Sequence, residues 1–202
     1  MREYNVEQRS PEWFKLRMGV ITASSTDNIL YESKQKPYLY QLLAEITTGI
    51  PNYIPLTDPM KWGIEHEDDA RQWYESTQKV SVRQTGFCKP DDKEYVGCSP
   101  DGIVGAKGLI EIKCPGSKKH ISNMHGVKDY SNINQTQFQM WIMDKDWCDL
   151  VSYDPRMPEH IRGYILRVYR NDEKIKKIAE AADGMYADIM KFCKKHNITP
   201  YA

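Results

Sequence analysis

The sequence has no long apolar stretch. No segment approaches the roughly 20 consecutive apolar residues that a membrane-spanning helix needs, and the first residues, Met-Arg-Glu-Tyr-Asn, carry no apolar export signal. Internal repeats and low-complexity tracts are also missing from the 202 residues, a length that suits one domain with a sizeable core. We therefore expect a single domain over residues 1–202 that is cytoplasmic and has no membrane partner.

The sequence also lacks cysteine pairs at a metal-binding spacing. Its cysteines are odd in number and form no Cys-x-x-Cys pair; they are Cys88, Cys98, Cys114, Cys148 and Cys193. Disulfide frameworks use even numbers of cysteines, and zinc or iron–sulfur sites use closely spaced ones. The pattern argues against all three kinds of site and predicts reduced thiols.

The sequence also has no net charge, because 28 basic residues balance 28 acidic ones. A protein that holds nucleic acid by its phosphates needs positive charge, so this chain would have to gather its basic residues locally. Candidates are Lys113, Lys118, Lys119, Lys128 and the lysines of residues 174–195. For the last group a solvated helix face is the more common explanation.

What the sequence does contain is an acid and a lysine on one expected strand. Leu109 to Cys114 is rich in β-branched residues and predicts a strand. The period of two places Leu109, Glu111 and Lys113 on one face. The Cβ atoms of Glu111 and Lys113 would lie roughly 6 to 7 Å apart, so both side chains can reach one small polar centre.

Asp101 precedes this strand, and a turn at residues 105–108 brings it back alongside. A loop of three or five residues sets Asp101 opposite Glu111, whereas a four-residue loop sets it opposite Ile112, on the other face. We predict an odd loop, or a bulge that redirects the aspartate.

Two converging carboxylates repel each other unless a cation or a proton lies between them, and Mg²⁺ or Mn²⁺ suits such an oxygen-rich site. The pattern therefore favours metal-assisted hydrolysis of a phosphodiester. From spacing alone, a turn aspartate beside a surface Glu/Lys pair explains the segment equally well.

The segment Ser99-Pro-Asp-Gly, followed from Glu111 by Glu-Ile-Lys-Cys-Pro, resembles the phage lambda exonuclease and YqaJ-type viral recombinase family of PD-(D/E)XK nucleases. The resemblance implies an α/β fold with a mixed central β-sheet flanked by helices, as in restriction endonucleases. It implies one or two Mg²⁺ ions held by Asp101, Glu111 and the Ile112 carbonyl. Lys113 would then orient or deprotonate the attacking water.

A second motif lies near the N-terminus. Thr22 is expected to cap a helix that begins in a run of hydroxyl residues, and its exposed N–H groups would attract a phosphate. Taken alone, such a run is usually only a cap. The pattern Trp13-x-x-x-Arg-x-Gly-x-Ile-Thr-Ala-Ser resembles the same family, which implies that Arg17 and Ser24 grip a terminal 5′-phosphate. Thr22 belongs with them as a candidate DNA-binding residue.

Two helical motifs supply further candidates. The segment from Trp62-Gly to Ala-Arg71 resembles the family pattern and implies a glutamate near the metal at Glu67. Glu65 is the alternative, and acids in a first helical turn also compensate the helix dipole. Residues 133–142 predict a helix rich in amides, which need partners when buried. The family's Gln-x-Gln helix implies a catalytic role for Gln135, with Gln137 as second choice.

The rest of the chain predicts alternating helices and strands. Helices are expected at residues 37–48 and 62–74, and from Asn171 or Asp172 towards the C-terminus. Strands are expected at residues 79–87, 94–98, 147–153 and 163–170. Residues 117–131 lack clear periodicity and are expected to form a polar, basic loop near DNA.

The resemblance implies a metal-dependent exodeoxyribonuclease that digests one strand of linear double-stranded DNA 5′ to 3′, giving mononucleotides and a 3′ single-stranded tail. It also implies a ring-shaped homotrimer and a single-strand annealing protein as partner, in a bacterial or phage-infected host. A related endonuclease is the first alternative. A non-catalytic module that binds DNA ends is the second, but such a binder has no reason to keep two carboxylates facing an anionic backbone.

Overall fold

The fold is built on one mixed β-sheet. The computed structural model describes residues 1–200, and within them the main sheet has five strands in the order β3-β6-β7-β8-β9. These strands span Val82–Arg83, Gly102–Val104, Gly108–Lys113, Trp147–Tyr153 and Gly163–Tyr169. β7 and β8 are parallel, and the other neighbours are antiparallel. The predicted mixed sheet is therefore confirmed.

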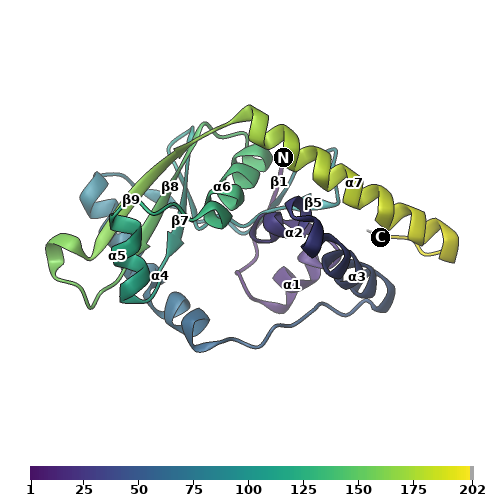
Figure 1. The fold of residues 1–202 in the computed structure, drawn as a ribbon, viewed down its shortest axis with the longest axis horizontal. Helices are drawn as coiled ribbons and strands as arrows, with labels where there is room; N and C mark the ends of the chain where they lie inside the picture. Colours follow the sequence, from purple (N-terminus) through teal and green to yellow (C-terminus); the bar gives the residue numbers. More distant parts are fainter. Residues whose placement is uncertain (201–202) are drawn as a thin grey trace.

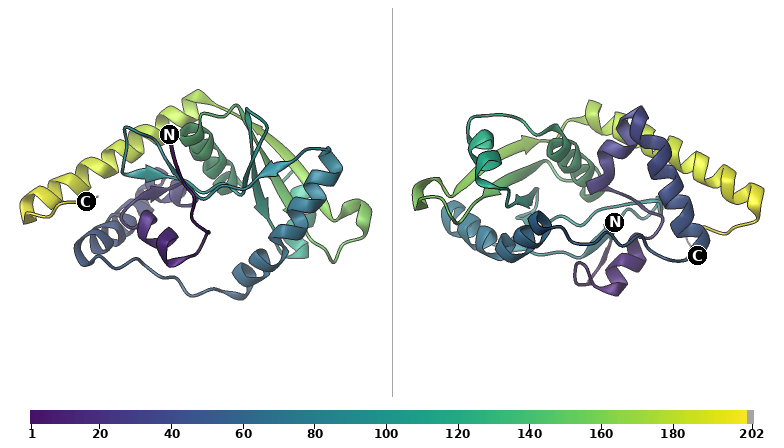
Figure 2. Two further views of the ribbon diagram at one scale, coloured as in Figure 1. Left: turned by 180° about the vertical axis from the view of Figure 1, so that it is seen from behind. Right: turned by 60° about the horizontal axis from the view of Figure 1, so that its bottom comes forward.

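Strand β7 lies at the centre of this sheet and alternates between two cores. Leu109 is buried in the core on the side of helix α6 (Tyr130–Met143). Ile110 and Ile112 are buried on the side of helix α4 (Asp58–Gln78). The two helices flank the sheet, as Figures 1 and 2 show from different sides. The period-two prediction for this strand is confirmed.

The larger core is covered by the long C-terminal helix α7 (Asp172–His196), which runs along the upper edge of the molecule in Figure 1. Its apolar stripe includes the buried side chains of Ile178 and Ile189. The Asn171 side chain accepts a hydrogen bond from the Lys174 N–H, so Asn171 is the cap. No helix within residues 1–200 is both long enough and apolar enough to cross a bilayer.

Short elements close the N-terminal side of the same core. Strand β1 (Arg2–Tyr4) pairs with β4 (Phe87–Lys89), and β2 (Ile21–Thr22) pairs with β5 (Val96–Gly97). The helices here are α1 (Pro11–Arg17), α2 (Thr26–Leu30) and α3 (Glu32–Thr48). All five cysteines are buried free thiols.

The strand expected at residues 79–87 is wrong in its extent. It is divided into β3, which pairs with β6, and β4, which pairs with β1. Gly86 lies at the division, where an added Cβ would stand 2.1 Å from the Tyr4 carbonyl oxygen. Only glycine permits this close approach, which lets the chain pass from one sheet to the other. The strand expected at residues 94–98 is likewise reduced to β5.

Residues 117–131 were expected to be a loop, but they contain the helix α5 (Ser117–Met124). Its anchor is His120, which is fully buried. The two ring nitrogens of His120 lie 2.9 Å from the Ser152 hydroxyl and 2.8 Å from the Ile161 carbonyl oxygen. Contacts to β8 and to the β8–β9 connection therefore hold a helix that is too short to show its period in the sequence.

The turn after β8 joins three elements through one buried carboxylate. Asp154 is fully buried and accepts hydrogen bonds from the Arg156 guanidinium at 2.8 and 2.9 Å and from the Ser117 hydroxyl at 2.7 Å. The Arg156 guanidinium in turn lies 4.4 Å from the centre of the Trp62 ring in α4. The hydrogen bonds from Arg156, and to a lesser extent the one from Ser117, lower the pKa of Asp154 to about 2.

We expect Asp154→Asn to destabilise the protein by about 1 to 2 kcal/mol at pH 7. The pKa shift alone corresponds to roughly 2 kcal/mol, and the half-exposed Arg156 partner reduces that value. Because the folded-state pKa is lowered, the contribution is present above the unfolded pKa near 4 and is lost as pH falls towards 2. Urea unfolding of both proteins between pH 7 and pH 2.5 tests this. A difference that stays constant over that range would contradict the charge-based explanation.

Candidate active site

The hairpin of β6 and β7 sets two carboxylates opposite each other. Gly102 pairs with Ile110 and Val104 with Gly108, which leaves a three-residue loop. Gly105 begins this loop with a φ of +58°, a conformation that glycine adopts without strain. The predicted odd loop is confirmed, and the register continued by one residue brings Asp101 opposite Glu111.

Asp101 is held against the edge of β7. Its Oδ2 accepts a hydrogen bond of 2.6 Å from the Ile112 N–H. Burial raises the pKa of Asp101 well above its usual value, and the negative charges of Glu111 and Glu67 raise it further. The structure thus brings Asp101 into one electrostatic cluster with two other acids.

Glu111 is the centre of this cluster. It is only 3% exposed, and its carboxylate accepts hydrogen bonds of 2.6 Å each from Lys113 Nζ, Gln135 Nε2 and Gln139 Nε2. Burial lowers the pKa of Lys113, but the neighbouring carboxylates of Glu111 and Asp101 outweigh burial and raise that pKa overall. The two carboxylates therefore stabilise the charged form of Lys113.

Glu67 reaches the cluster from α4. It is half-buried, and burial raises its pKa; the Arg71 charge acts against this shift, and the Glu111 charge adds to it. Glu67 and Asp101 line the same cavity of about 360 Å³. Glu65, the alternative weighed from sequence, is exposed.

Helix α6 supplies one expected and one unexpected amide. Gln135 contacts Glu111, and its Oε1 lies 3.4 Å from Lys113 Nζ. Gln137, the second choice from sequence, is wrong for the site because it bonds to the Tyr169 carbonyl and the Asn171 N–H. Gln139 takes its place, since residues four apart lie on one helix face. That spacing from Gln135 was visible in the sequence and would have identified it.

The cluster fits a divalent cation by its charge. Asp101, Glu111 and Glu67 place three acidic side chains around the ammonium of Lys113, and a bound cation would remove the repulsion between their charged forms. Mg²⁺ is commonly held by one or two carboxylates and keeps several waters. Within residues 1–200 no three acidic, histidine or cysteine side chains already form a complete ligand set. Waters and a backbone carbonyl would have to complete it.

Arg17, Thr22 and Ser24 form a second polar cluster. Arg17 Nη2 lies 3.3 Å from Thr22 Oγ1 and 3.4 Å from Ser24 Oγ. The guanidinium stacks 4.0 Å from the centre of the Trp13 ring, and burial lowers the pKa of Arg17 to about 10. A half-buried cation beside two hydroxyls is suited to an anionic group.

The helix expected to begin at Thr22 is wrong in form. Thr22 is followed by a single 3₁₀ turn, η1 (Ala23–Ser25), and then by the five-residue helix α2. The Thr22 side chain caps no N–H, because its hydroxyl faces Arg17 and Ser24 instead. No helix dipole therefore contributes to a phosphate site at Thr22, and the site depends on the arginine and the hydroxyls.

One hydrogen bond joins the two clusters. Trp13 Nε1 donates to Ser99 Oγ at 2.9 Å, and Ser99 stands two residues before Asp101. The Arg17 guanidinium stacks over the same indole ring. Ser99 was part of the motif quoted from the sequence, but no role was assigned to it. Its position shows that the hairpin and the Arg17 cluster are held in a fixed relation.

The chain resembles known proteins in both sequence and fold. The family model described as the YqaJ-like viral recombinase domain matches residues 12–146. An alkaline exonuclease, LHK-Exo, from Laribacter hongkongensis superposes with a TM-score of 0.87 at 31% identity, over 93% of this chain and 96% of that one. A phage-related exonuclease from Haemophilus somnus 129PT superposes with a TM-score of 0.73 at 16% identity, over 88% and 96% of the two chains, which shows the fold alone.

A protein from Acanthamoeba polyphaga mimivirus, R354, is 25% identical over 159 residues. The match covers 72% of this chain but only 29% of the viral protein, so the chain spans less than a third of that relative. The family model, in contrast, covers more than half of the chain and includes both clusters. The chain belongs to the YqaJ-like viral recombinase domain family.

Proposed function

We propose that this protein is a metal-dependent exodeoxyribonuclease that degrades one strand of linear double-stranded DNA from a 5′-phosphorylated end. The products would be mononucleotides and a 3′ single-stranded tail. The observation that carries the proposal is the joining of the two clusters. Three acids and a lysine converge on β7, and the Trp13–Ser99 hydrogen bond ties them to a half-buried arginine that contacts two hydroxyls. The likeness to an alkaline exonuclease supports the same reading.

Asp101, Glu111, Glu67 and the Ile112 carbonyl would hold one or two Mg²⁺ ions, or Mn²⁺. A bound ion would supply positive charge for the scissile phosphate and the leaving oxygen. Lys113 would orient or deprotonate the attacking water, and Gln135 would hold the lysine and Glu111 in place because it contacts both.

Each turnover would regenerate its own recognition group. Water attacks the phosphorus, the bond between phosphorus and the 3′ oxygen breaks, and that oxygen takes up a proton. The new end of the remaining strand then carries a 5′-phosphate. Arg17 and Ser24, with Thr22, would bind this phosphate and register the next bond at the acids.

Digestion of a linear duplex labelled at either end tests the proposal. With Mg²⁺ present, a 5′ label should be released at once as a mononucleotide, and a 3′ label on the same strand should remain in the single-stranded tail. A closed circular duplex is the control and should stay intact. Cleavage of the circle would favour the endonuclease, and binding of ends without cleavage would favour the non-catalytic module.

We expect Arg17→Ala to remove a preference for phosphorylated ends. An arginine–phosphate contact contributes on the order of 1.5 to 3 kcal/mol, so the unmodified protein should start roughly ten-fold or more faster on 5′-phosphorylated than on 5′-hydroxyl duplex. The variant should digest both substrates at the slow 5′-hydroxyl rate. Initial rates on the two duplexes give the measurement.

Ser24→Ala should produce a similar defect, and the double variant should add little to either single change. Equal slowing of both substrates by Arg17→Ala would make Arg17 a general backbone contact or a folding residue.

The family resemblance also leads us to propose a ring-shaped homotrimer that works with a single-strand annealing protein in recombination. Light scattering of the purified protein tests the first part. A monomeric mass at micromolar concentration would reject it.

A further inference from the structure

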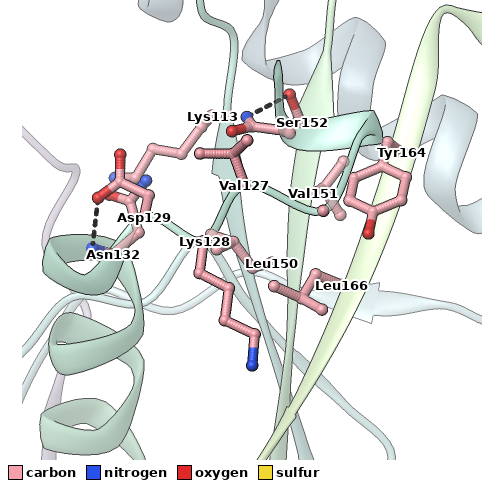
Figure 3. Close-up of a pocket in the computed structure, with 12 residues that line it drawn as sticks. Lys113, Val127, Lys128, Asp129, Asn132, Leu150, Val151, Ser152, Tyr164 and Leu166 are labelled. Atoms are coloured by element: carbon pink, nitrogen blue, oxygen red, sulfur yellow. Dashed lines mark hydrogen bonds between the residues drawn. The ribbon is translucent and has the colours of Figure 1, made fainter. Parts of the chain in front are cut away.

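A second cavity lies beside Lys113, over strands β8 and β9. It has a volume of about 110 Å³, and Lys113 is part of its wall. Figure 3 shows Lys113 and Asp129 on one side, Tyr164 on the opposite side, and Leu150 and Leu166 between them. The cavity is thus formed by β8, β9 and the connection between α5 and α6.

The walls of this cavity combine flat apolar surface with a few polar groups. Leu150, Leu166 and the Tyr164 ring supply the apolar part, and Lys128 and Asn132 lie at its polar side. Leu150 and Leu166 are paired neighbours on β8 and β9, and Glu111 pairs with Leu150 on β7. Cross-strand neighbours share a face of the sheet, so the cavity floor continues the surface that carries Glu111.

The strand order places the acids of β7 between the Ser99 end of the hairpin and the cavity. The Arg17 cluster is tied to Ser99, just before β6, whereas the cavity lies over β8 and β9. In the sheet, β7 stands between β6 and β8. A strand whose 5′-phosphate is at Arg17 would therefore pass the acids of β7 before it reached the cavity.

We propose that this cavity, here named the base pocket, binds the base of the second nucleotide from the 5′ end, immediately beyond the scissile phosphate. The proposal rests on the proposed function. Apolar walls with few polar groups suit the face of a nucleobase, and stacking of this kind accepts every base. Lys128 adds positive charge on the side where the continuing backbone would leave the site.

Filling the pocket tests the proposal. Leu166 is half-buried on the edge strand β9, so Leu166→Trp should fold and occupy the pocket. Ile121→Trp is the matched control, since Ile121 is exposed on α5 and does not line the pocket. Single-turnover rates are compared on a 5′-phosphorylated duplex and on the same duplex with a tetrahydrofuran abasic residue at position two.

Loss of the base should slow the unmodified protein and Ile121→Trp by about ten-fold, the scale of one stacked base. Leu166→Trp should be slowed similarly on the intact duplex but show no further loss on the abasic one. Equal rates on both duplexes for all three proteins would overturn the base pocket and leave the nuclease standing. If the unmodified protein cleaved neither duplex, the proposed function itself would be rejected.

A binding measurement without metal gives a second readout. A duplex with 2-aminopurine at position two should change its fluorescence on binding to the unmodified protein, because the base would enter the pocket beside Tyr164. The change should be lost with Leu166→Trp and with Val127→Trp, a second variant at an exposed position of the pocket wall. A probe at position one should respond equally in all variants. If the pocket variants changed the fluorescence of the probe at position one and not that of the probe at position two, the proposal would be overturned.

Discussion

Asp101→Asn and Glu111→Gln are each expected to lower the single-turnover rate of DNA cleavage by more than a hundredfold, a barrier increase of roughly 3 kcal/mol. Each change removes a negative charge from the acid cluster with little change of shape. The register of the β6–β7 hairpin sets the two residues opposite each other, so either loss would leave a cation without one of its three charged ligands. Retention of more than about a hundredth of the rate would remove that residue from the site.

The two variants should differ in stability. Burial and two neighbouring charges disfavour ionised Asp101 in the folded state, so Asp101→Asn should melt at an equal or higher temperature without metal. Glu111→Gln should melt lower, because its new amide would face three hydrogen-bond donors. Circular dichroism melting separates these outcomes from misfolding.

A matched pair on α4 provides the control for activity. Glu67→Gln should slow cleavage, because Glu67 shares a cavity with Asp101. Glu65→Gln, two residues away and exposed, should leave the rate unchanged. If Glu65→Gln slowed cleavage and Glu67→Gln did not, Glu65 would be the glutamate of the active site.

Lys113→Ala is expected to stop cleavage while sparing metal binding. Within residues 1–200, Lys113 is the single ammonium in contact with Glu111. Loss of a positioned proton donor or acceptor costs on the order of a hundred- to ten-thousand-fold in rate. The metal would still meet all three acids. Isothermal titration with Mg²⁺ and single-turnover cleavage, made on the same preparation, give the comparison.

Lys113→Arg is the companion variant, since arginine keeps the charge but cannot release a proton near neutral pH. It should bind metal like the unmodified protein and remain slow. A parallel fall of metal affinity and rate in Lys113→Ala would make the lysine structural. Full activity of Lys113→Arg would exclude deprotonation as its task.

The hairpin was predictable from the sequence because its geometry depends only on residues that are close together in the chain. A period of two decides which face Glu111 takes, and the length of one short loop decides what stands opposite it. The same holds for Asn171, whose cap depends on residues within one helical turn. Such features need no knowledge of the remaining chain.

Features that depend on distant contacts were missed. Helix α5 is held by hydrogen bonds from His120 to two residues more than thirty positions away, and no local period reports them. Gly86 divides an expected strand because the chain meets Tyr4 there. Gln139 is a different case, because its place beside Gln135 follows from the helical period of four residues and not from the Gln-x-Gln motif.

The order of strands around β7 also has a consequence for how the protein folds. The hairpin that joins Asp101 to Glu111 closes over three residues, whereas the parallel pairing of β7 with β8 waits for the crossover through α5 and α6. Local contacts form early, and distant ones carry a larger loop-closure entropy. The carboxylates are therefore expected to meet before Gln135 and Gln139 arrive to bind Glu111, so closure of the crossover, rather than formation of the acidic hairpin, should limit the rate of folding.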